Sequence, residues 1–308
     1  MTTTAPHIPV LLNEVVSGIA PKNGGVYVDG TFGAGGYSKA VLNAADCKVY
    51  AIDRDPTAID AGRETAARYD GRLTLIRGTF GQMKELLGAF GVDRVDGVML
   101  DIGVSSMQID DAERGFSFQK DGKLDMRMSR EGQSAYDVVN RFSEKELADI
   151  IYQYGEERFS RRIAKAIVEA RRESPIETTL ALAQTVHSVM PKKKDGIDTA
   201  TRTFQALRIY VNDELEQLRS GLSEAEELLV KGGRMAVVSF HSLEDRIVKT
   251  FMQEKSGKTA RASRYAPEVA QTAPTLKLLN KKPILPSSEE CDKNPRSRSA
   301  RLRLAEAV

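Results

Sequence analysis

The chain has few of the residues that build metal centres and disulfide frameworks. Its 308 residues include two cysteines and three histidines. Cys47 and Cys291 are far apart in the sequence, so they predict neither a disulfide framework nor a cysteine-based zinc site. The histidines, at positions 7, 187 and 241, are widely spaced and show no metal-ligand pattern. We therefore expect no bound metal.

Long apolar runs and a strong net charge are also missing. No apolar run approaches the roughly 20 residues that span a bilayer, and the N-terminus lacks the basic region and apolar stretch of a secretory signal. The formal net charge is +2, so no global field points to a nucleic acid, and only local clusters of charge could do so. With 41% hydrophobic residues the chain can bury a core. These features predict a cytoplasmic protein with no membrane partner.

The most informative stretch lies between residues 26 and 53. A β-prone run, residues 26–29, ends in an acid and is followed by a glycine-rich turn at residues 33–36. A helix-like segment comes next, and a second apolar run, residues 49–53, ends in another carboxylate. This order of strand, glycine turn, helix, strand and acid is typical of a site for a nucleoside-containing cofactor.

The glycines of this turn distinguish between cofactors. A dinucleotide fingerprint has three spaced glycines, and this chain has Gly33 and Gly35 but Ser38 at the third position. The third glycine permits close packing of helix and strand beside a pyrophosphate, so its absence disfavours NAD. S-adenosylmethionine contains no pyrophosphate. Its amino-acid part can lie against the turn and its ribose hydroxyls can meet Asp53. The turn alone leaves open an ordinary strand–helix connection without a ligand.

Two further apolar runs extend the pattern. Residues 72–76 and 95–101 are predicted to be a third and a fourth strand, and residues 55–68 a helix with Pro56 in its first turn. Alternating strands and helices imply a parallel sheet, whose ligands lie beyond the carboxyl ends of the strands. The residues that fall at those ends are the turn at 33–36, Asp53, Phe80 and Asp101.

A largely helical pattern follows from Ser143 to Gln217. Ser143 and Glu146 have the spacing of a capping box, and further helices are expected around residues 163–170, at 178–189 and at 201–220. A continuation of the last helix to residue 229 would follow a break near Gly221. The strand pattern resumes at residues 232–240, with candidate closing strands at 276–285 and 299–304. We therefore expect one sheet domain, residues 1–107 and 218–308, interrupted by a helical insertion, residues 108–217.

Several blocks along the chain are similar to one known family. They include Asp29-Gly-Thr-Phe-Gly-Ala-Gly-Gly36, Leu100-Asp-Ile-Gly-Val-Ser-Ser106, Thr201-Arg-Thr-Phe-Gln-Ala-Leu-Arg208 and Ser239-Phe-His-Ser-Leu-Glu-Asp-Arg-Ile247. Together, in this order and over nearly the whole chain, they resemble the MraW family of bacterial ribosomal RNA small subunit methyltransferases.

The resemblance implies a fold and a reaction. The fold is an α/β class I S-adenosylmethionine-dependent methyltransferase sheet, Rossmann-like, with an inserted all-helical domain that recognises RNA. The reaction transfers a methyl group from S-adenosylmethionine to the exocyclic N4 of one specific cytidine in the decoding region of 16S rRNA. The implied partner is that rRNA, either free or within the small ribosomal subunit. The oligomeric state stays open, a homodimer included.

The resemblance also implies a set of cofactor contacts. The family's positions carry over to Gly35, Gly36, Tyr37, Asp53, Phe80, Asp101 and Gln108. The residue after the glycine pair is commonly histidine in the family and is Tyr37 here. A backbone contact at that position survives this difference, whereas a contact through an imidazole does not.

Asp101 is the candidate for the chemistry. The cytosine amine is a poor nucleophile, and a carboxylate that accepts its N–H would hold the nitrogen in a reactive geometry. The Asp/Asn-Pro-Pro-Tyr motif of many amino-methyltransferases is absent, and Asp101-Ile-Gly-Val-Ser105 stands in its place. We hypothesise that Asp101 contacts the cofactor and borders the amine; a cofactor contact without a chemical role is the alternative. His241 is either a group near the target nucleotide or a structural hydrogen-bonding residue.

Other residues are candidates for contacts with RNA. Phe116, Phe118 and Tyr154 could stack on an extruded base or pack in a core. The basic candidates are Arg161, Arg162, Lys165, Arg171 and Arg172 on one helix, Lys192 to Lys194, and Arg296, Arg298, Arg301 and Arg303. Such clusters are either solvated faces or phosphate contacts. The rival functions are methyl transfer to a protein or small molecule, a dinucleotide-dependent oxidoreductase, and a non-enzymatic RNA-binding protein.

Overall fold

The computed structural model describes residues 9–191, 198–258 and 273–308. The chain forms two compact units, one of residues 1–103 and 215–308 and the other of residues 104–214. The division expected from the sequence placed these boundaries after residues 107 and 217. We call the first the sheet unit and the second the helical unit.

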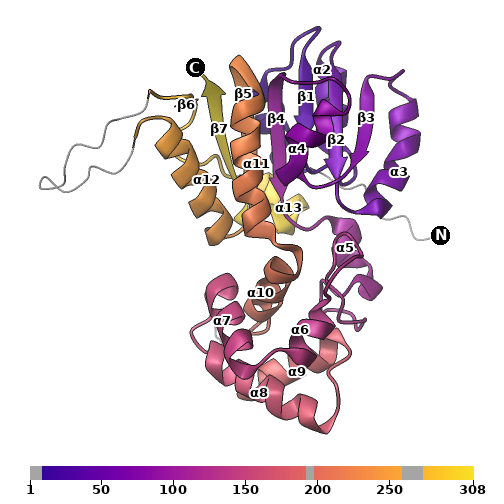
Figure 1. Cartoon of the computed structure of the whole chain (residues 1–308), viewed down its shortest axis with the longest axis vertical. Helices are drawn as coiled ribbons and strands as arrows, with labels where there is room; N and C mark the ends of the chain where they lie inside the picture. Colours follow the sequence, from indigo (N-terminus) through magenta and orange to yellow (C-terminus); the bar gives the residue numbers. More distant parts are fainter. Residues whose placement is uncertain (1–8, 192–197, 259–272) are drawn as a thin grey trace, which may run out of the picture. The chain divides into compact units, whose positions relative to one another are not determined.

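The sheet unit contains one seven-stranded sheet in the order β3-β2-β1-β4-β5-β7-β6 (Figure 1). The strands are β1 (Val26–Asp29), β2 (Lys48–Asp53), β3 (Leu73–Arg77), β4 (Val95–Ile102), β5 (Leu229–Ser239), β6 (Leu276–Leu278) and β7 (Arg301–Ala307). The first five are parallel, and β7 is antiparallel to both β5 and β6. The order reverses at β1, so β1 and β4 flank the switch point at which such sheets bind ligands. The predicted α/β, Rossmann-like fold is confirmed.

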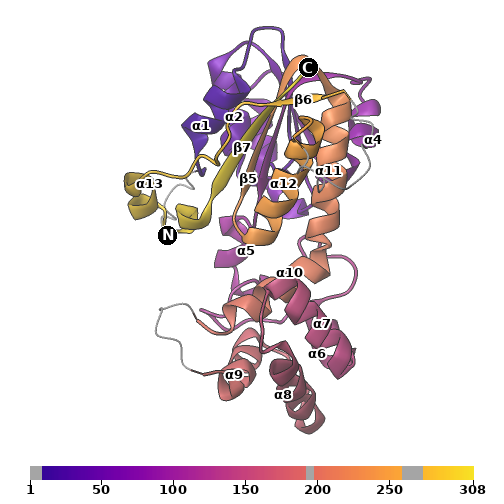
Figure 2. The same ribbon diagram turned by 90° about the vertical axis from the view of Figure 1, so that its left-hand side faces the viewer.

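Helices cover both faces of this sheet because the buried strands are apolar on both sides. In β4, Val98 and Leu100 belong to the core with α4 (Met83–Gly88), α11 (Glu214–Leu228) and α12 (Ser242–Lys255). Met99, between them, belongs to the core with α1 (Leu12–Ile19) and α2 (Gly36–Ala44). Figure 2 shows α1 and α12 on opposite sides of β5 and β7. The remaining helix that covers the early strands is α3 (Pro56–Ala67).

One predicted closing strand is shorter than expected. Only Leu276–Leu278 forms β6, whereas the sequence pattern extended to residue 285. Pro283 cannot donate to a strand ladder, and Asn280 turns the chain, because its side-chain amide donates to the carbonyl oxygen of Lys282. Contact with the sheet resumes as an isolated bridge between Ile284 and Leu302.

The antiparallel strand β7 is fastened to the start of α12 by a buried carboxylate. Asp245 accepts hydrogen bonds from Arg303 Nε at 2.7 Å and from Arg301 Nη1 at 3.0 Å. Burial alone would raise the pKa of Asp245, but these hydrogen bonds outweigh it, so the pKa lies below its ordinary value. Arg301 and Arg303, two of the C-terminal RNA candidates, therefore hold the fold together.

We expect Asp245→Ala to lower the free energy of unfolding by roughly 3 kcal/mol, because it leaves the largely buried Arg303 guanidinium without its partner. Since the folded-state pKa is depressed, the contribution of Asp245 is present above the ordinary aspartate pKa and is lost as the pH falls through the lowered value. Denaturant titrations at neutral and acidic pH measure both effects. Asp60→Ala, in an exposed pair with Arg63, is the control; an equal loss in both variants would contradict this account.

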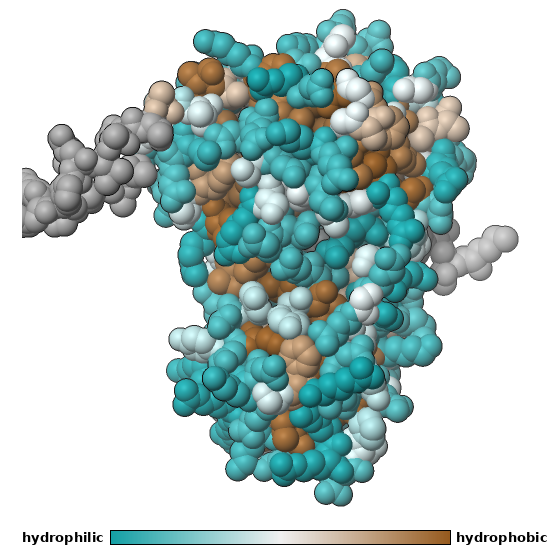
Figure 3. Space-filling view, viewed as in Figure 1, coloured by the Kyte–Doolittle hydropathy of each residue, from teal (hydrophilic) through white to brown (hydrophobic). Residues whose placement is uncertain are grey.

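The helical unit is a bundle around its own core. Its helices are α5 (Ser106–Asp110), α6 (Ala135–Arg141), α7 (Glu144–Gly155), α8 (Ser160–Glu173), α9 (Thr179–Val189) and α10 (Thr201–Asn212). The predicted capping box of α7 is present, with the Ser143 hydroxyl oxygen accepting from the Glu146 N–H. Leu147, Ile151, Ile163 and Ile167 pack in one cluster with residues of α9 and α10. On the face drawn in Figure 3, hydrophilic residues predominate at the surface.

The predicted break near Gly221 is wrong. The long helical pattern breaks instead at Asp213, which has a left-handed φ of 50° and separates α10 from α11. Gly221 lies inside α11, where a Cβ would approach the Phe80 ring to 2.4 Å. This glycine therefore serves close packing rather than a turn.

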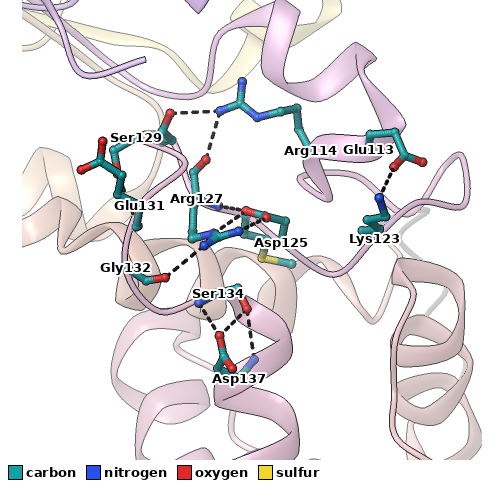
Figure 4. A network of polar contacts seen from close by, with 12 residues as sticks. Glu113, Arg114, Lys123, Asp125, Arg127, Ser129, Glu131, Gly132, Ser134 and Asp137 are labelled. Carbon is teal, nitrogen blue, oxygen red and sulfur yellow. Dashed lines mark hydrogen bonds and ion pairs between the residues drawn. The ribbon is translucent and has the colours of Figure 1, made fainter. Parts of the chain in front are cut away.

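A long connection between α5 and α6 contains a short 3-10 helix, Ala112–Arg114, and is organised mainly by polar contacts (Figure 4). The Arg127 guanidinium donates two hydrogen bonds to the Asp125 carboxylate, of 3.0 and 2.6 Å. The buried Arg114 donates to the carbonyl oxygens of Arg127 and Met128. Asn212 of α10 accepts from the Met128 N–H and donates to the Met126 carbonyl oxygen. These contacts fix the connection within the helical unit.

Candidate active site

The glycine turn joins β1 to α2 at the carboxyl end of the sheet. Gly35, the N-cap of α2, has a left-handed φ of 73°, and a Cβ there would lie 2.7 Å from the Phe32 ring. Both facts require glycine. No side chain caps α2. A helix N-terminus of this kind presents backbone N–H groups that favour a carboxylate or another anion.

Asp53 ties the end of β2 to this turn. Its Oδ2 accepts the Gly33 N–H at 2.7 Å, and its Oδ1 accepts the Asp55 N–H at 2.8 Å. Burial raises the pKa of Asp53 in spite of these hydrogen bonds. Each carboxylate oxygen has a second lone pair. Asp53 can therefore accept from a ligand hydroxyl while it holds the turn.

Asp29, at the end of β1, has a structural role that the sequence did not reveal. Its fully buried carboxylate accepts from the Ser38 hydroxyl at 2.7 Å and from the Thr31 N–H at 3.2 Å. Burial raises the pKa of Asp29 to about 6. Ser38, where a dinucleotide fingerprint has its third glycine, thus joins the first turn of α2 to β1. A serine hydroxyl and an acid nine residues apart gave no local pattern that would have paired them.

Asp101 lies at the end of β4, next to β1 in the sheet. Its N–H donates to the Thr31 hydroxyl oxygen at 2.7 Å, which places it beside the glycine turn. Its Oδ1 is buried and has no hydrogen-bond partner among the residues that the structure describes. Burial first, and then the nearby Asp29 and Glu244 carboxylates, raise the pKa of Asp101 to about 7. Asp101 therefore has a free acceptor oxygen and exchanges its proton near neutral pH.

The other cofactor candidates occupy different environments. Phe80 follows β3 and its Cβ lies 2.9 Å from the Cβ position of Gly30, so it belongs to the same edge of the sheet. Tyr37 is buried in the first turn of α2, and its hydroxyl donates to the carbonyl oxygen of Val10. Gln108 lies in the helical unit, where it forms the capping box of α5 with Ser105. The structure thus brings Gly35, Gly36, Tyr37, Asp53, Phe80 and Asp101 to one edge of the sheet unit.

His241 has the surroundings of a structural residue. It is the N-cap of α12: its Nδ1 accepts the Glu244 N–H at 3.4 Å, and its Nε2 lies 2.9 Å from Glu244 Oε1. Glu244 is fully buried, and its other oxygen accepts the Phe240 and His241 N–H groups. Because both imidazole nitrogens face Glu244, the geometry favours a helix-capping role over contact with a nucleotide.

The aromatic candidates pack within the helical unit. Phe118 contacts the Phe204 ring at a centroid distance of 4.7 Å, and Tyr154 contacts Tyr210 at 6.2 Å. Phe116 lies under the Arg114 guanidinium. All three candidates are partly buried against the core of this unit, which supports the packing interpretation over base stacking.

The arginines of the basic helix α8 are of two kinds: one binds other parts of the protein, and the others are exposed. Arg171 donates to the carbonyl oxygens of Val139 and Phe142, so it caps the end of α6 and is not a phosphate candidate. Arg161, Arg162 and Arg172 are exposed and form no hydrogen bond or ion pair with the described part of the chain. Lys192 to Lys194 lie outside the described residues. The exposed arginines of α8 are therefore the best-defined phosphate candidates.

Two observations test whether this edge fits S-adenosylmethionine. The uncapped N-terminus of α2 suits the carboxylate of its amino-acid part. The unpartnered Asp101 Oδ1 and the acceptor oxygens of Asp53 suit its cationic and hydroxyl groups.

Among the described residues, no group of three or more histidine, cysteine or acidic side chains is arranged to hold a metal ion. No described helix is long and apolar enough to cross a membrane.

The sheet order, the glycine turn and the acids at the strand ends define an S-adenosylmethionine-dependent methyltransferase of class I. The model of the MraW methylase family matches residues 4–308, and the chain belongs to this family. The expected family, its fold and its cofactor are thereby confirmed.

Two curated relatives and one solved structure illustrate the similarity. The chain is 59% identical over 302 residues to "Ribosomal RNA small subunit methyltransferase H" of Paramagnetospirillum magneticum, covering 97% of this chain and 95% of that one. It is 60% identical over 301 residues to the protein of the same name from Rhodospirillum centenum, covering 97% and 92%. A putative methyltransferase from Streptococcus mutans in complex with SAH aligns over 98% of this chain and 100% of that one, at 10% identity and a TM-score of 0.46.

Proposed function

We propose that this protein transfers a methyl group from S-adenosylmethionine to the exocyclic N4 of one cytidine in the decoding region of 16S rRNA. Curated relatives at 53–60% identity carry the name ribosomal RNA small subunit methyltransferase H, which supports the rRNA substrate. The observation that supports an amino nitrogen as the methylated atom is the buried Oδ1 of Asp101, which has no partner among the described residues. With ribosomal RNA as substrate, we expect the protein in the cytoplasm.

The chain's own residues would bind and orient the reactants. Gly35, Gly36, Asp53 and Phe80 are the proposed donor contacts at the sheet edge. Gln108, in the helical unit, stays a prediction from the family resemblance. When bound, S-adenosylmethionine supplies a methyl group already activated by its sulfonium. The enzyme then mainly needs to align the attacking nitrogen with the methyl carbon. In well-oriented reactions, proximity and orientation lower the activation barrier by about 7 kcal/mol or more.

Asp101 would orient the amine. Its free Oδ1 can accept one N–H of the cytosine amino group and so hold the nitrogen lone pair toward the methyl carbon. With a pKa of about 7, the same oxygen can take the proton that the nitrogen loses on methylation. Asp101 thus combines an orienting role and a proton-accepting role in one group.

Mass mapping of modified nucleosides in 16S rRNA tests the proposal. Cells that lack the protein should lose one N4-methyl mark on a decoding-region cytidine, and the purified enzyme with tritiated donor should restore it on that rRNA. Assays on the free rRNA and on the assembled small subunit then identify the preferred form of the substrate. Label transferred only to protein or to a small molecule would contradict the proposal.

The exposed arginines of α8 are proposed phosphate contacts. We expect Arg161→Ala combined with Arg162→Ala to weaken rRNA binding and to reduce the slope of log affinity against log salt by about 1 to 2, because each phosphate contact releases condensed counterions. Fluorescence anisotropy over a salt series measures the slope. Arg63→Ala in α3 combined with Arg68→Ala at its C-cap, both exposed, is the matched control. An unchanged slope in the α8 variant would contradict the phosphate role.

A further inference from the structure

The chain before α1 packs directly on the start of the donor site. We call residues 9–11 the N-terminal strap. A Cβ added to Gly36 would lie only 2.0 Å from Pro9 Cγ, so glycine at this position lets the strap lie against the first turn of α2. Val10 and Leu11 are buried in the core that contains α2. The strap is therefore part of the wall behind the glycine turn.

Two polar contacts from distant parts of the sequence hold the strap. The Tyr37 hydroxyl, from α2 itself, donates to the Val10 carbonyl oxygen. The Leu11 N–H donates to Glu290 Oε1 of α13 (Ser288–Lys293) at 2.7 Å. Leu11 has a left-handed φ of 51°, a conformation that leucine adopts only when its surroundings hold it. The strap is thus held by these two tethers together with its buried side chains.

We propose that the N-terminal strap, tethered by Tyr37 and Glu290, sets the position of the glycine turn and so the affinity for the methyl donor. This inference rests on the proposed donor contacts at Gly35 and Gly36. Those residues present backbone N–H groups, which bind only where the start of α2 is placed correctly. Tyr37 and Glu290 are therefore positioning residues, and the Tyr37 side chain acts on the donor through Val10.

The first test removes one hydroxyl. We expect Tyr37→Phe to raise the Kd and the KM for S-adenosylmethionine about fivefold, the size of effect that one hydrogen bond produces, with less than about a twofold change in the KM for rRNA. Tyr27→Phe is the matched control. Tyr27 is equally buried in the same unit, and its hydroxyl accepts from the Lys22 N–H, beyond the N-terminal end of β1. It should lose a similar amount of stability and keep its donor affinity.

The second test uses the other tether. Glu290→Ala should weaken donor binding as Tyr37→Phe does, whereas Glu290→Gln keeps an acceptor oxygen and should restore most of the affinity. Glu289→Ala, on the same helix and paired only with Lys293 in the described structure, should have no effect. Because both tethers act through one strap, the effects of Tyr37→Phe and Glu290→Ala should be less than additive in the double variant.

Calorimetric titration of the full-length folded variants with S-adenosylmethionine decides the matter. If both Tyr37→Phe and Glu290→Ala bind the donor with wild-type affinity, the proposed role of the strap is wrong, whereas the proposed function is unaffected. An equal loss in Tyr27→Phe would also overturn it, because the effect would then be one of general stability. Absence of donor binding by the folded wild type would overturn the proposed function together with the strap.

Discussion

Replacing Asp101 with asparagine is expected to lower kcat by about a hundredfold or more, the range of general acid–base effects, while the affinity for S-adenosylmethionine changes by less than about threefold. The asparagine side chain is similar in size but cannot take a proton, and it presents an amide N–H group where the carboxylate presents a second acceptor oxygen. Single-turnover rates on rRNA and calorimetric donor binding separate the two quantities. Lost donor affinity with normal turnover at saturating donor would mean that Asp101 only contacts the cofactor.

The pH dependence of the rate gives a second view of Asp101. Burial raises its pKa to about 7. The carboxylate is the form that accepts the amine N–H, so kcat/KM should rise about tenfold per pH unit below that value and level off above it. The Asp101→Asn variant should lose this dependence. A wild-type profile that falls with rising pH over the same range would contradict the assignment.

The same shift predicts an effect on stability with a defined sign. Between the ordinary aspartate pKa and about 7, the folded state binds the Asp101 proton more tightly than the unfolded state does. Unfolding therefore becomes easier as the pH rises through that window. At about pH 8 the Asp101→Asn variant, which has no charge to bury, should melt at a higher temperature than the wild type. Stability and activity would then change in opposite directions at this residue.

Asp53→Ala is expected to weaken S-adenosylmethionine binding about a hundredfold, since hydrogen bonds to a charged group are worth roughly 1.5–3 kcal/mol each. The change removes both the proposed ribose contact and the acceptor that holds the Gly33 N–H at 2.7 Å. The KM for rRNA should stay within about twofold, because Asp53 acts on the donor side alone. Calorimetry and steady-state kinetics provide the two measurements.

A matched variant separates this effect from general loss of charge. Asp46, which follows α2 and precedes β2, is exposed and its carboxylate lies 3.8 Å from Arg72. Asp46→Ala therefore removes an acid from the same unit without touching the glycine turn. Donor affinity should be unchanged in this variant. If Asp53→Ala behaves in the same way, the assignment of Asp53 to the donor site is wrong.

The sequence was informative wherever a short stretch determines its own structure. The first five strands are apolar runs that end in turns or acids, and their positions matched within a few residues. The capping box at Ser143 is likewise local, because its partner is three residues away. The sequence pattern did not predict the break at Asp213 and placed one near Gly221 instead, because tertiary packing and not a short stretch determines the conformation there. Glycine is a poor helix former, but packing against Phe80 keeps Gly221 helical.

The sequence predicted which residues of the site lie at the carboxyl ends of the strands, but not which contacts hold them in place. Parallel strands bring their carboxyl ends together, so Asp53 and Asp101 could be placed from sequence. The groups that hold them form contacts between distant segments, as in Leu11 with Glu290 or Asp245 with Arg303. Periodicity contains no information about such pairs. For that reason the sequence did not reveal that Arg171, Arg301 and Arg303 bind other parts of the chain.

The most direct test of the account is the binding of S-adenosylmethionine to the purified, folded chain, measured by titration calorimetry beside Asp53→Ala. The account predicts saturable binding by the wild type and binding about a hundredfold weaker in the variant. No binding by the wild type, or equal binding by both proteins, would contradict a donor site at the carboxyl ends of β1, β2 and β4.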